Sequence, residues 1–448
     1  MRKLFGTDGI RAVAGQAPLD RATIYAVGLA LAHQLRAAHP VPRVLLGMDT
    51  RVSGEWIARV MAAGLEAGGA TLANAGVITT PAIAYLTRKF GFSTGVVISA
   101  SHNPWQDNGI KLFGADGYKL PDALEMAIEE EIFRLLASGG EAVETDALPA
   151  VDAVYRHDYE AYLQGAVPGL TLAGVHVVLD CANGAASAIA SELFAGLGGR
   201  VELTHVSPDG RNINAGCGAL HPEIVAAETK ARGAAMGVTV DGDADRALFA
   251  DADGRVVNGD AVLLLAARAL KADGSLAGDL VVATTMSNMG LEAALERDGI
   301  HMLRAPVGDK YVLEMMQAHG ASLGGEQSGH ILFPHLATTG DGLLTALVVL
   351  DIVRRAGRPL RELVADLKVF PQVIVNVRVR EKKPLEGFAT VAATIGEAEE
   401  ALAGRGRVVV RYSGTEALAR VMIEAESEQE MRMHAERIAG AIRMEIGA

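Results

Sequence analysis

The sequence predicts a multidomain protein of the α/β class that ends in a smaller α+β domain. Its 448 residues correspond to about three domains at roughly 150 residues per domain. Short apolar runs, each followed by a helical pattern, recur through the first four-fifths of the chain. After about Pro371 the pattern changes, and valines at every second position alternate with Ile374, Asn376, Arg378 and Arg380. These three observations predict the fold class.

The early apolar runs are continuous rather than alternating, which is typical of strands that are buried on both faces of a sheet. Helices are then expected on both sides of the sheet, and ligands are expected at the carboxyl ends of the strands. The clearest runs are residues 44–49, 95–99, 175–180 and 280–284.

The C-terminal segment has the pattern of a half-exposed antiparallel strand followed by an amphipathic helix. The alternating positions of the strand are Val373, Val375, Val377 and Val379. Ser427 and Glu430 form a capping box before the helix, and its apolar face carries Met431, Ala435, Ile438 and Ile442. Earlier domain boundaries are expected near residues 139–146 and 251–254, where polar and turn residues gather.

Composition and charge exclude several classes of protein. Half of the residues are hydrophobic and 21% are charged, as in globular proteins rather than disordered or fibrous ones. The net charge of −13 argues against a partner made of nucleic acid. Cys181 and Cys217 are too few for a disulfide framework, and no signal peptide or membrane span is recognised. A cytoplasmic protein without a membrane or nucleic-acid partner is expected.

The first candidate site is residues 99–104, which directly follow a buried-strand run. The segment places the Ser101 hydroxyl beside the His102 imidazole at the end of a strand. Ser101 is therefore a candidate nucleophile or phosphate carrier, although a simple turn has the same composition. Lys111, on the next predicted strand, favours the chemical interpretation because it can supply charge or carry a proton near Ser101.

Three carboxylates crowd the end of another predicted strand, at Asp241, Asp243 and Asp245. Unpaired, they repel one another, and a hard divalent cation such as Mg²⁺ or Ca²⁺ relieves that repulsion. The segment does not match an EF-hand loop, because Arg246 occupies the sixth position and Ala252 the twelfth. Arg246 also predicts an anion close to the metal. A solvated acidic turn is the alternative.

Two further loops combine residue types that bind sugars and phosphates. Residues 324–330 offer a carboxylate, an amide, a hydroxyl and an imidazole on flexible backbone, which suits a polyhydroxylated ligand or, equally, a polar turn. Residues 411–416, with Arg420 beyond them, offer two guanidinium groups, two hydroxyls and exposed backbone N–H groups. That set favours a phosphate cradle. Surface arginines paired with Glu416 or Glu424 are the alternative.

Residues 91–95 match the Gly-x-Ser-x-Gly nucleophile elbow, and this match is rejected. The elbow requires a strand before it and a helix after it. Here a helical pattern precedes the segment and a strand follows it. Ser93 is therefore not a candidate nucleophile.

The four loops, in this order, resemble those of the α-D-phosphohexomutase superfamily, and the likeness covers essentially the whole chain. Residues 100–104 resemble the phosphoserine loop of the family, and residues 241–246 its magnesium loop. Residues 326–330 resemble its sugar-binding loop, and residues 411–415 with Arg420 its phosphate-binding loop.

Two segments are similar to the glucosamine-directed bacterial branch of this superfamily. Residues 5–11 resemble the start of that branch, with Arg11 at a position that faces the active site. Glu-Gln-Ser at residues 326–328 also resembles that branch, whereas relatives directed to glucose or mannose often carry methionine or glutamate in the middle. The family often has proline where this chain has Tyr412 and Ala417. This difference affects the expected rigidity of the phosphate loop more than its expected function.

The resemblance implies three similar α/β domains with mixed sheets around a central cleft, and a C-terminal α+β domain of the TATA-binding-protein-like type. The implied domains are residues 1–152 with the phosphoserine loop, 153–252 with the metal loop, 253–368 with the sugar loop and 369–448 with the phosphate loop.

The resemblance also implies an isomerase that interconverts glucosamine 6-phosphate and glucosamine 1-phosphate, and so feeds UDP-N-acetylglucosamine and cell-wall precursor synthesis. Phosphorylated Ser101 would donate its phosphate, with glucosamine 1,6-bisphosphate as the intermediate. The implied Mg²⁺ ligands are Ser101, Asp241, Asp243 and Asp245. The implied catalytic residues are Ser101, His102, Lys111, Arg246, His330 and Arg11. The implied substrate-binding residues are Gly308, Asp309, Lys310, Glu326, Ser328, Arg411, Ser413, Gly414, Thr415 and Arg420.

Three other functions remain open. The nearest is a phosphoglucomutase or phosphomannomutase of the same superfamily. A magnesium-dependent sugar phosphatase shares the acidic loop, but a phosphate retained on Ser101 argues against net hydrolysis. A sensor of sugar phosphates without catalysis is the third. The expected partner is a small hexosamine phosphate, and the expected state is a monomer or a homodimer.

Overall fold

The computed structural model describes residues 4–6, 8–139, 142–413 and 417–448. The chain divides into two compact units. Unit 1 comprises Met1–Thr284 and Leu303–Ala365, and unit 2 comprises Thr285–Met302 and Asp366–Ala448. Residues 285–302 therefore belong with the C-terminal residues although they lie in the middle of the sequence.

Unit 1 begins with a five-stranded mixed sheet in the order β1-β5-β4-β2-β3. β2 is parallel to β3 and β4, whereas β5 is antiparallel to β4 and β1. The strands are β1 (Ile10–Val13), β2 (Arg43–Met48), β3 (Thr71–Val77), β4 (Thr94–Ile98) and β5 (Asp107–Gly114). The helices of this part are α1 (Arg21–Leu35), α2 (Gly54–Ala67), α3 (Thr80–Lys89) and α4 (Asp122–Ala137).

The strands β2 and β4 confirm the predictions made from continuous apolar runs. Every residue of β4 is buried, and in β2 only Arg43 is exposed. The rejected elbow at residues 91–95 lies between α3 and β4, so a helix precedes it and a strand follows it, as predicted. Lys111 lies on β5, directly beside β4, as predicted.

The second sheet repeats the design of the first, with the order β10-β9-β8-β6-β7. β6 is parallel to β7 and β8, and β9 is antiparallel to β8 and β10. The strands are β6 (His176–Asp180), β7 (Arg200–Thr204), β8 (Met236–Val240), β9 (Ala247–Asp251) and β10 (Val256–Val257). The helices are α5 (Ala153–Ala166), η1 (Ala185–Ala188), α6 (Ala190–Ala195), η2 (Gly218–Leu220) and α7 (Pro222–Arg232).

The turn at residues 251–254, expected near a domain boundary, is the hairpin that joins β9 to β10. Both strands belong to the second sheet, because Val257 pairs with Phe249 and Val256 with Ala250. Turn residues therefore mark a reversal inside the sheet at this point rather than its end.

The third sheet has four strands in the order β12-β11-β13-β14. β11 is parallel to β13, and β13 is antiparallel to β14. The strands are β11 (Leu280–Thr284), β12 (His301–Ala305), β13 (Gly324–Gly325) and β14 (Ile331–Leu332). The helices in this stretch of the chain are α8 (Gly259–Ala272), η3 (Ala277–Asp279), α9 (Met289–Arg297), α10 (Asp309–His319), α11 (Gly342–Ala356) and α12 (Leu360–Leu363).

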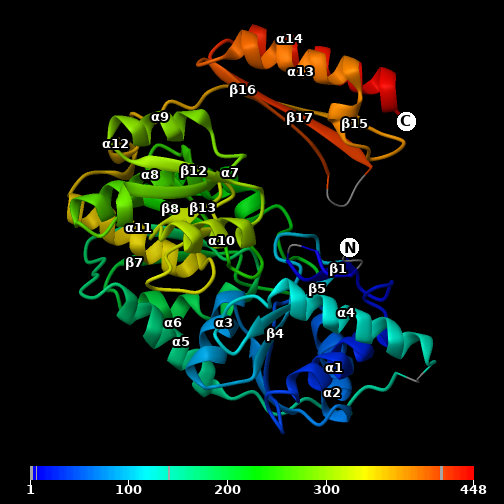
Figure 1. Ribbon diagram of the computed structural model, residues 1–448. Helices are drawn as coiled ribbons and strands as arrows, with labels where there is room; N and C mark the ends of the chain where they lie inside the picture. Colours follow the sequence, from blue (N-terminus) through cyan, green and yellow to red (C-terminus); the bar gives the residue numbers. More distant parts are fainter. Residues whose placement is uncertain (1–3, 7, 140–141, 414–416) are drawn as a thin grey trace. The chain divides into compact units, whose positions relative to one another are not determined.

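Unit 2 contains an antiparallel sheet in the order β15-β17-β16, and two helices cover one of its faces (Figure 1). The elements are β15 (Gln372–Arg378), η4 (Leu385–Gly387), α13 (Ala389–Leu402), β16 (Gly406–Tyr412), β17 (Leu418–Ala425) and α14 (Glu428–Ile446). Glu430 N donates to Ser427 Oγ over 3.3 Å. The predicted apolar face of α14 is buried against the sheet. The predicted change to an antiparallel α+β domain is confirmed.

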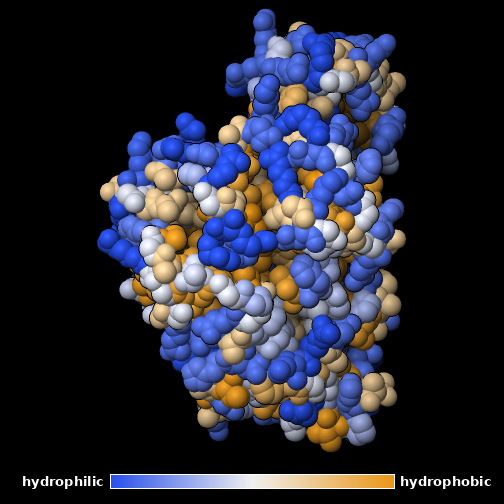
Figure 2. Space-filling model, turned by 90° about the vertical axis from the view of Figure 1, so that its left-hand side faces the viewer, coloured by the Kyte–Doolittle hydropathy of each residue, from blue (hydrophilic) through white to orange (hydrophobic). Residues whose placement is uncertain are grey.

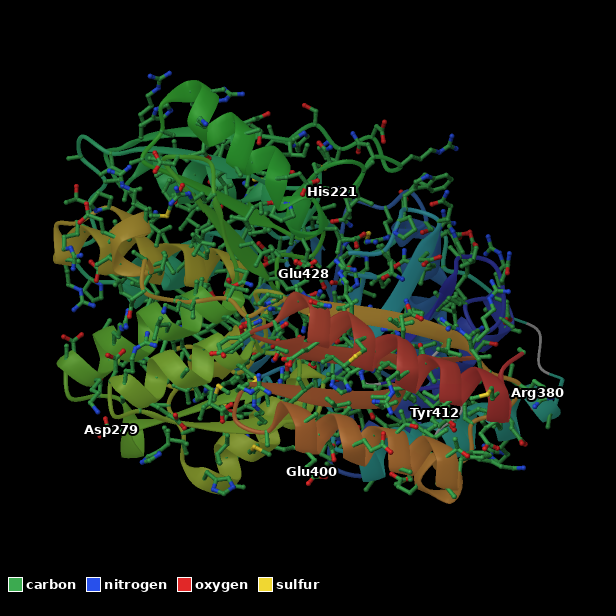
Figure 3. All side chains as sticks on the ribbon, turned by 90° about the horizontal axis from the view of Figure 1, so that it is seen from above. His221, Asp279, Arg380, Glu400, Tyr412 and Glu428 are labelled. Carbon is green, nitrogen blue, oxygen red and sulfur yellow. The ribbon has the colours of Figure 1, made fainter. Side chains whose placement is uncertain are left out.

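Hydrophilic side chains cover most of the face drawn in Figure 2, with apolar side chains in patches between them. Glu400 of α13 and Glu428 of α14 are exposed on the helix pair of unit 2 (Figure 3). Within the part of the chain that the structure describes, no helix is both long enough and apolar enough to span a bilayer.

Two glycines allow α1 and α2 to pack with their backbones in contact. A Cβ atom at Gly64 would lie 2.2 Å from the carbonyl oxygen of Tyr25, and one at Gly28 would lie 2.4 Å from that of Met61. Both obstacles are backbone atoms of the facing helix, so neither can rotate away. The pair supports the first sheet, since α1 and α2 contribute to the same hydrophobic core as β2 and β4.

We predict that Gly64→Ala destabilises the protein by about 1–3 kcal/mol, because the added methyl group must push α1 away from α2. Gly165→Ala is the matched control: Gly165 lies in α5 with nothing within 4 Å of an added Cβ. Alanine there improves helix propensity by about 0.5–1 kcal/mol. Thermal unfolding of the two variants checks the contrast, and equal midpoints would contradict it.

Candidate active site

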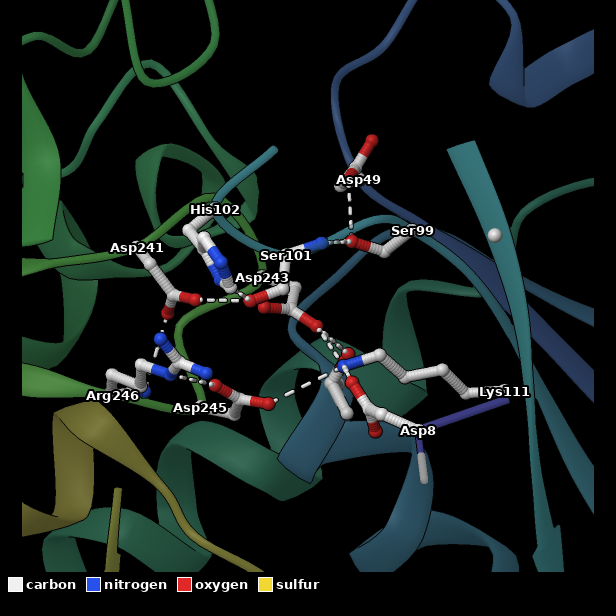
Figure 4. A network of polar contacts seen from close by, with 12 residues as sticks. Asp8, Asp49, Ser99, Ser101, His102, Lys111, Asp241, Asp243, Asp245 and Arg246 are labelled. Atoms are coloured by element: carbon white, nitrogen blue, oxygen red, sulfur yellow. Dashed lines mark hydrogen bonds and ion pairs between the residues drawn. The ribbon is translucent and has the colours of Figure 1, made fainter. Parts of the chain in front are cut away.

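Three of the predicted loops meet in unit 1. Residues 99–104 follow β4, residues 241–246 follow β8, and residues 326–330 join β13 to β14. Figure 4 shows Ser101 facing Asp241, with Lys111 among the carboxylates nearby. Each loop begins where a buried strand ends, which is the position expected for ligand-binding residues in α/β sheets.

The Ser101 hydroxyl points into the acidic loop. Its Oγ donates to Asp241 Oδ2 over 2.5 Å and lies 3.2 Å from His102 Nδ1. Glycine at position 242 permits this approach, because a Cβ atom there would lie 2.6 Å from the Ser101 carbonyl oxygen. Burial and the charges of Arg246 and Arg11 lower the pKa of His102 to about 4, so its imidazole is neutral beside the hydroxyl at neutral pH.

The three aspartates of the acidic loop form one buried cluster, whose carboxylate oxygens lie within 4.8 Å of one another. Burial, followed by the charges of Asp245 and Asp243, raises the pKa of Asp241 to about 8. Asp243 Oδ1 and Asp245 Oδ1 are buried and make no hydrogen bond among the described residues. Buried carboxylate oxygens that make no hydrogen bond are suited to bind a hard divalent cation. The residues present therefore fit Mg²⁺.

Lys111 is 2% exposed and contacts three carboxylates. Its Nζ lies 2.8 Å from Asp243, 3.0 Å from Asp8 and 3.3 Å from Asp245. Burial opposes the charge of Lys111, but these carboxylates outweigh it and raise its pKa well above the usual value. Its ammonium group is therefore charged and held in one place.

Lys111 belongs to a closed ring of alternating charges. Lys119 joins Asp8 to Asp309 with two contacts of 2.6 Å. His330 closes the ring, with Nε2 3.5 Å from Asp309 and Nδ1 3.6 Å from Asp245. Burial opposes the charge of His330, but Asp245, Asp309 and Glu326 raise its pKa to about 9. The ring connects the two candidate proton carriers, Lys111 and His330.

A cavity of about 180 Å³ opens beside this ring. The residues around it that the sequence had singled out are Arg11, Asp245, Arg246, Gly308, Asp309, Glu326 and His330. Glu326 accepts from Gly308 N over 3.0 Å and from Ser328 Oγ over 3.1 Å. Lys310 does not line this cavity, since its Nζ forms an ion pair with Asp122.

The remaining predicted residues form a separate cluster in unit 2. Arg411 and Arg420 are directly opposite each other on β16 and β17, and both line a cavity of about 350 Å³ with Asn376 and Met286. Burial and the charge of Arg420 lower the pKa of Arg411. Arg420 Nη2 donates to Ser413 Oγ over 3.4 Å. Gly414 and Thr415 lie outside the described residues.

Five polar residues contact the site without having been singled out in the sequence. Thr80 donates to Asp243 Oδ2 over 2.6 Å, and Asp8 and Lys119 belong to the ring. Arg51 and Asn214 both donate to the Ser101 carbonyl oxygen. Each of the five contacts a site residue that lies far away in the sequence. Asp8 alone carried a signal, because it lies in the opening segment beside Arg11.

The relatives of this chain match it from end to end. A phosphoglucosamine mutase of Koribacter versatilis is 59% identical over 453 residues, covering 100% of this chain and 98% of the relative. A phosphoglucosamine mutase of Solibacter usitatus is 54% identical, covering 100% and 99%. The resemblance stated from the four loops is confirmed.

Solved structures share the fold at low sequence identity. A phosphoglucomutase/phosphomannomutase family protein from Burkholderia thailandensis has a TM-score of 0.78 at 22% identity, covering 98% of this chain and 97% of its own. The Aspergillus fumigatus N-acetylphosphoglucosamine mutase, solved in complex with GlcNAc-6P and magnesium, has a TM-score of 0.65 at 19% identity, covering 99% and 96%. The predicted fold class is confirmed.

The family models of phosphoglucomutase/phosphomannomutase match the chain in four successive parts. The α/β/α domains I, II and III match residues 2–138, 159–254 and 258–370. The C-terminal domain matches residues 374–441. Together with relatives that are more than half identical over the full length, these matches show that the chain belongs to the phosphoglucomutase/phosphomannomutase family.

Proposed function

We propose that this protein is a phosphoglucosamine mutase that interconverts glucosamine 6-phosphate and glucosamine 1-phosphate. The observation that carries the proposal is the Ser101 hydroxyl, held 2.5 Å from a buried carboxylate cluster with two oxygens that lack hydrogen bonds among the described residues. A serine in that position is suited to carry a phosphoryl group beside a cation. The name shared by relatives that are 59% and 54% identical supports glucosamine as the sugar.

Phosphoryl transfer depends mainly on alignment and on neutralisation of charge. Asp241, Asp243, Asp245 and phosphorylated Ser101 would hold Mg²⁺, which supplies most of that neutralisation when it is bound. The Arg246 guanidinium borders both the aspartates and the cavity, so it can face the transferring phosphoryl group. The neutral His102 imidazole lies close enough to Ser101 to support the phosphoserine.

Lys111 and His330 are the candidate proton carriers, one for the sugar hydroxyl that attacks and one for the hydroxyl that leaves. Both are buried and both are held by Asp245, so their positions are fixed before substrate binds. Glu326 lines the 180 Å³ cavity and accepts from Ser328 Oγ, and both residues are suited to bind sugar hydroxyls. Arg11, predicted to be catalytic, and Gly308, predicted to bind substrate, line the same cavity and are suited to these roles.

The phosphate that does not react requires a cationic site of its own. Arg411, Ser413 and Arg420 on the sheet of unit 2, with Gly414 and Thr415, are suited to this role, because two guanidinium groups on neighbouring strands can share one phosphate. Since the reacting phosphate alternates between the two ends of the sugar, glucosamine 1,6-bisphosphate must be the intermediate.

We also propose the division into domains at residues 1–152, 153–252, 253–368 and 369–448, because each part carries one of the four loops.

Substrate preference distinguishes this function from its rivals. We expect the purified protein to turn over glucosamine 6-phosphate at least about tenfold better, by kcat/KM, than glucose 6-phosphate or mannose 6-phosphate. The measurement is a coupled assay with each sugar and with a glucosamine 1,6-bisphosphate primer. Equal or better turnover of glucose or mannose 6-phosphate would favour another mutase of the family. Stoichiometric release of inorganic phosphate would favour a phosphatase.

Ser101→Ala should reduce mutase turnover by about a thousandfold or more, since it removes the group that carries the phosphate. Intact mass should show one phosphoryl group on the active protein and none on the variant. Ser93→Ala is the control, because Ser93 matches a nucleophile motif but lies at the edge of β4, away from the acidic loop. Normal activity of the Ser101 variant would refute the role of phosphate carrier.

Asp243→Asn should weaken binding of Mg²⁺ or Mn²⁺ by at least about tenfold, because it removes one charge from the three-carboxylate cluster. Titration calorimetry, or the electron spin resonance signal of Mn²⁺, measures this without relying on activity. Asp351→Asn is the control for loss of a carboxylate, since Asp351 in α11 pairs with Arg354 and Arg355 instead of the acidic loop. Unchanged metal affinity in Asp243→Asn, or full activity of the native protein in excess chelator, would exclude this metal site.

A further inference from the structure

Ser101 is held in a backbone conformation that residues with side chains rarely adopt. Its φ is +52°, in the left-handed region that favours glycine. In this conformation Ser101 Oγ faces Asp241, to whose Oδ2 it donates over 2.5 Å. Such a conformation persists only where the surrounding structure fixes it. The hydrogen bonds that fix it are therefore part of what makes Ser101 a suitable phosphate carrier.

One set of hydrogen bonds holds the N–H of Ser101. Ser101 N donates to Ser99 Oγ over 2.9 Å, and Ser99 Oγ in turn donates to Asp49 Oδ2 over 2.5 Å. Asp49 follows β2, the neighbour of β4 in the sheet. This side of the loop is anchored within the first sheet.

A second set converges on the carbonyl groups of the same loop from two directions. Arg51 Nη2 donates to the carbonyl oxygens of Ser101 and Asn103, over 3.2 Å and 2.5 Å. Asn214 Nδ2 donates to the same two oxygens, over 2.9 Å and 3.3 Å. Two side chains that share two acceptors of one loop fix its position more tightly than one side chain can.

Both donors are themselves fixed. The Arg51 side chain is fully buried and forms an ion pair with Asp49, and Arg51 N donates to Asp49 Oδ1 over 3.0 Å. Asn214 belongs to the part of the chain that forms the second sheet, between β7 and η2. Its N–H donates to the Ala182 carbonyl oxygen over 2.9 Å. Arg51 and Asn214 therefore attach the Ser101 loop to the first and to the second sheet.

We propose that Arg51 and Asn214 are positioning residues that hold the Ser101 loop in its left-handed conformation and keep Ser101 Oγ aligned with the acidic loop. Neither side chain contacts the reacting hydroxyl in the structure; both act through the backbone carbonyl groups. The expected effect on turnover rests on the proposed function. The expected effect on the conformation of the Ser101 loop is independent of that function. Loss of either donor should slow phosphoryl transfer through misalignment of Ser101, with little effect on sugar binding.

Asn214→Ala and Arg51→Lys test the proposal in the full chain. The first variant removes one donor, and the second keeps the charge opposite Asp49 but replaces the planar fork that reaches both carbonyl groups. Asn74→Ala is the matched control. Asn74 is also a buried asparagine that donates to a backbone carbonyl group, that of Pro149 over 2.9 Å, and it accepts from Gly76 N over 2.8 Å.

Two readouts are needed. Hydrogen exchange of the dephosphorylated protein should be about tenfold or more faster in the peptide that covers residues 99–104 in both test variants, and unchanged there in Asn74→Ala. For glucosamine 6-phosphate, kcat should fall by about tenfold to a hundredfold while KM stays within about twofold of the wild type. A general loss of stability would instead speed exchange throughout the chain and in the control as well.

Exchange of residues 99–104 at the wild-type rate, or a fall in kcat no larger than that of Asn74→Ala, would overturn the proposal. If Asn214→Ala does not fold, the same two readouts on Arg51→Lys decide. If the wild-type protein has no mutase activity, the proposed function fails while hydrogen exchange still decides whether the two side chains hold the loop.

Discussion

Three carboxylates meet at one buried ammonium group, and the geometry of the candidate active site in unit 1 depends on that contact. Lys111 receives Asp8 from the N-terminal segment and Asp243 and Asp245 from the second sheet. A buried charge is tolerated only when it is paired. If the loops that supply these carboxylates moved apart, Lys111 would be exposed to solvent or left buried without a counter-charge. The contact fixes the acidic loop against β5, and the ring through Lys119 and His330 extends the same constraint to residues 326–330.

The repeated design of the first two sheets explains how a serine and an acidic loop come to face each other. Both sheets have the same pattern of parallel and antiparallel pairs, with β4 and β8 in the same central position. The Ser101 loop follows β4, and the acidic loop follows β8. The two sheets thus carry chemically different loops, the Ser101 loop and the acidic loop, at equivalent strand ends. Gly242 allows the backbones of these two loops to approach each other.

The sequence alone identified those parts of the candidate site whose residues lie close together in the chain. The Ser101 loop and the three aspartates follow continuous apolar runs, and both features are visible within ten residues. The change of strand pattern after Pro371 likewise revealed the antiparallel sheet of unit 2. Lys119, Arg51 and Asn214 could not be found in this way, because the site residues that they contact lie far along the chain. Asp8 stood in the recognised opening segment, but its contact with Lys111 could not be found in this way either. The pairing of Lys310 with Asp122 was equally inaccessible, since it depends on how α10 lies against the start of α4.

The make-up of unit 2 has a consequence for the order of events during synthesis. Asn288 donates to the fully buried carboxylate of Glu424, and Arg407 donates to the carbonyl oxygens of Thr285 and Ser287. Residues 285–302 are translated well before β15, β16 and β17, the strands of the sheet that they contact. These contacts can form only once β16 and β17 have been translated, near the end of synthesis. The attachment of residues 285–302 to the C-terminal sheet is therefore completed late, after most of unit 1 has been synthesised.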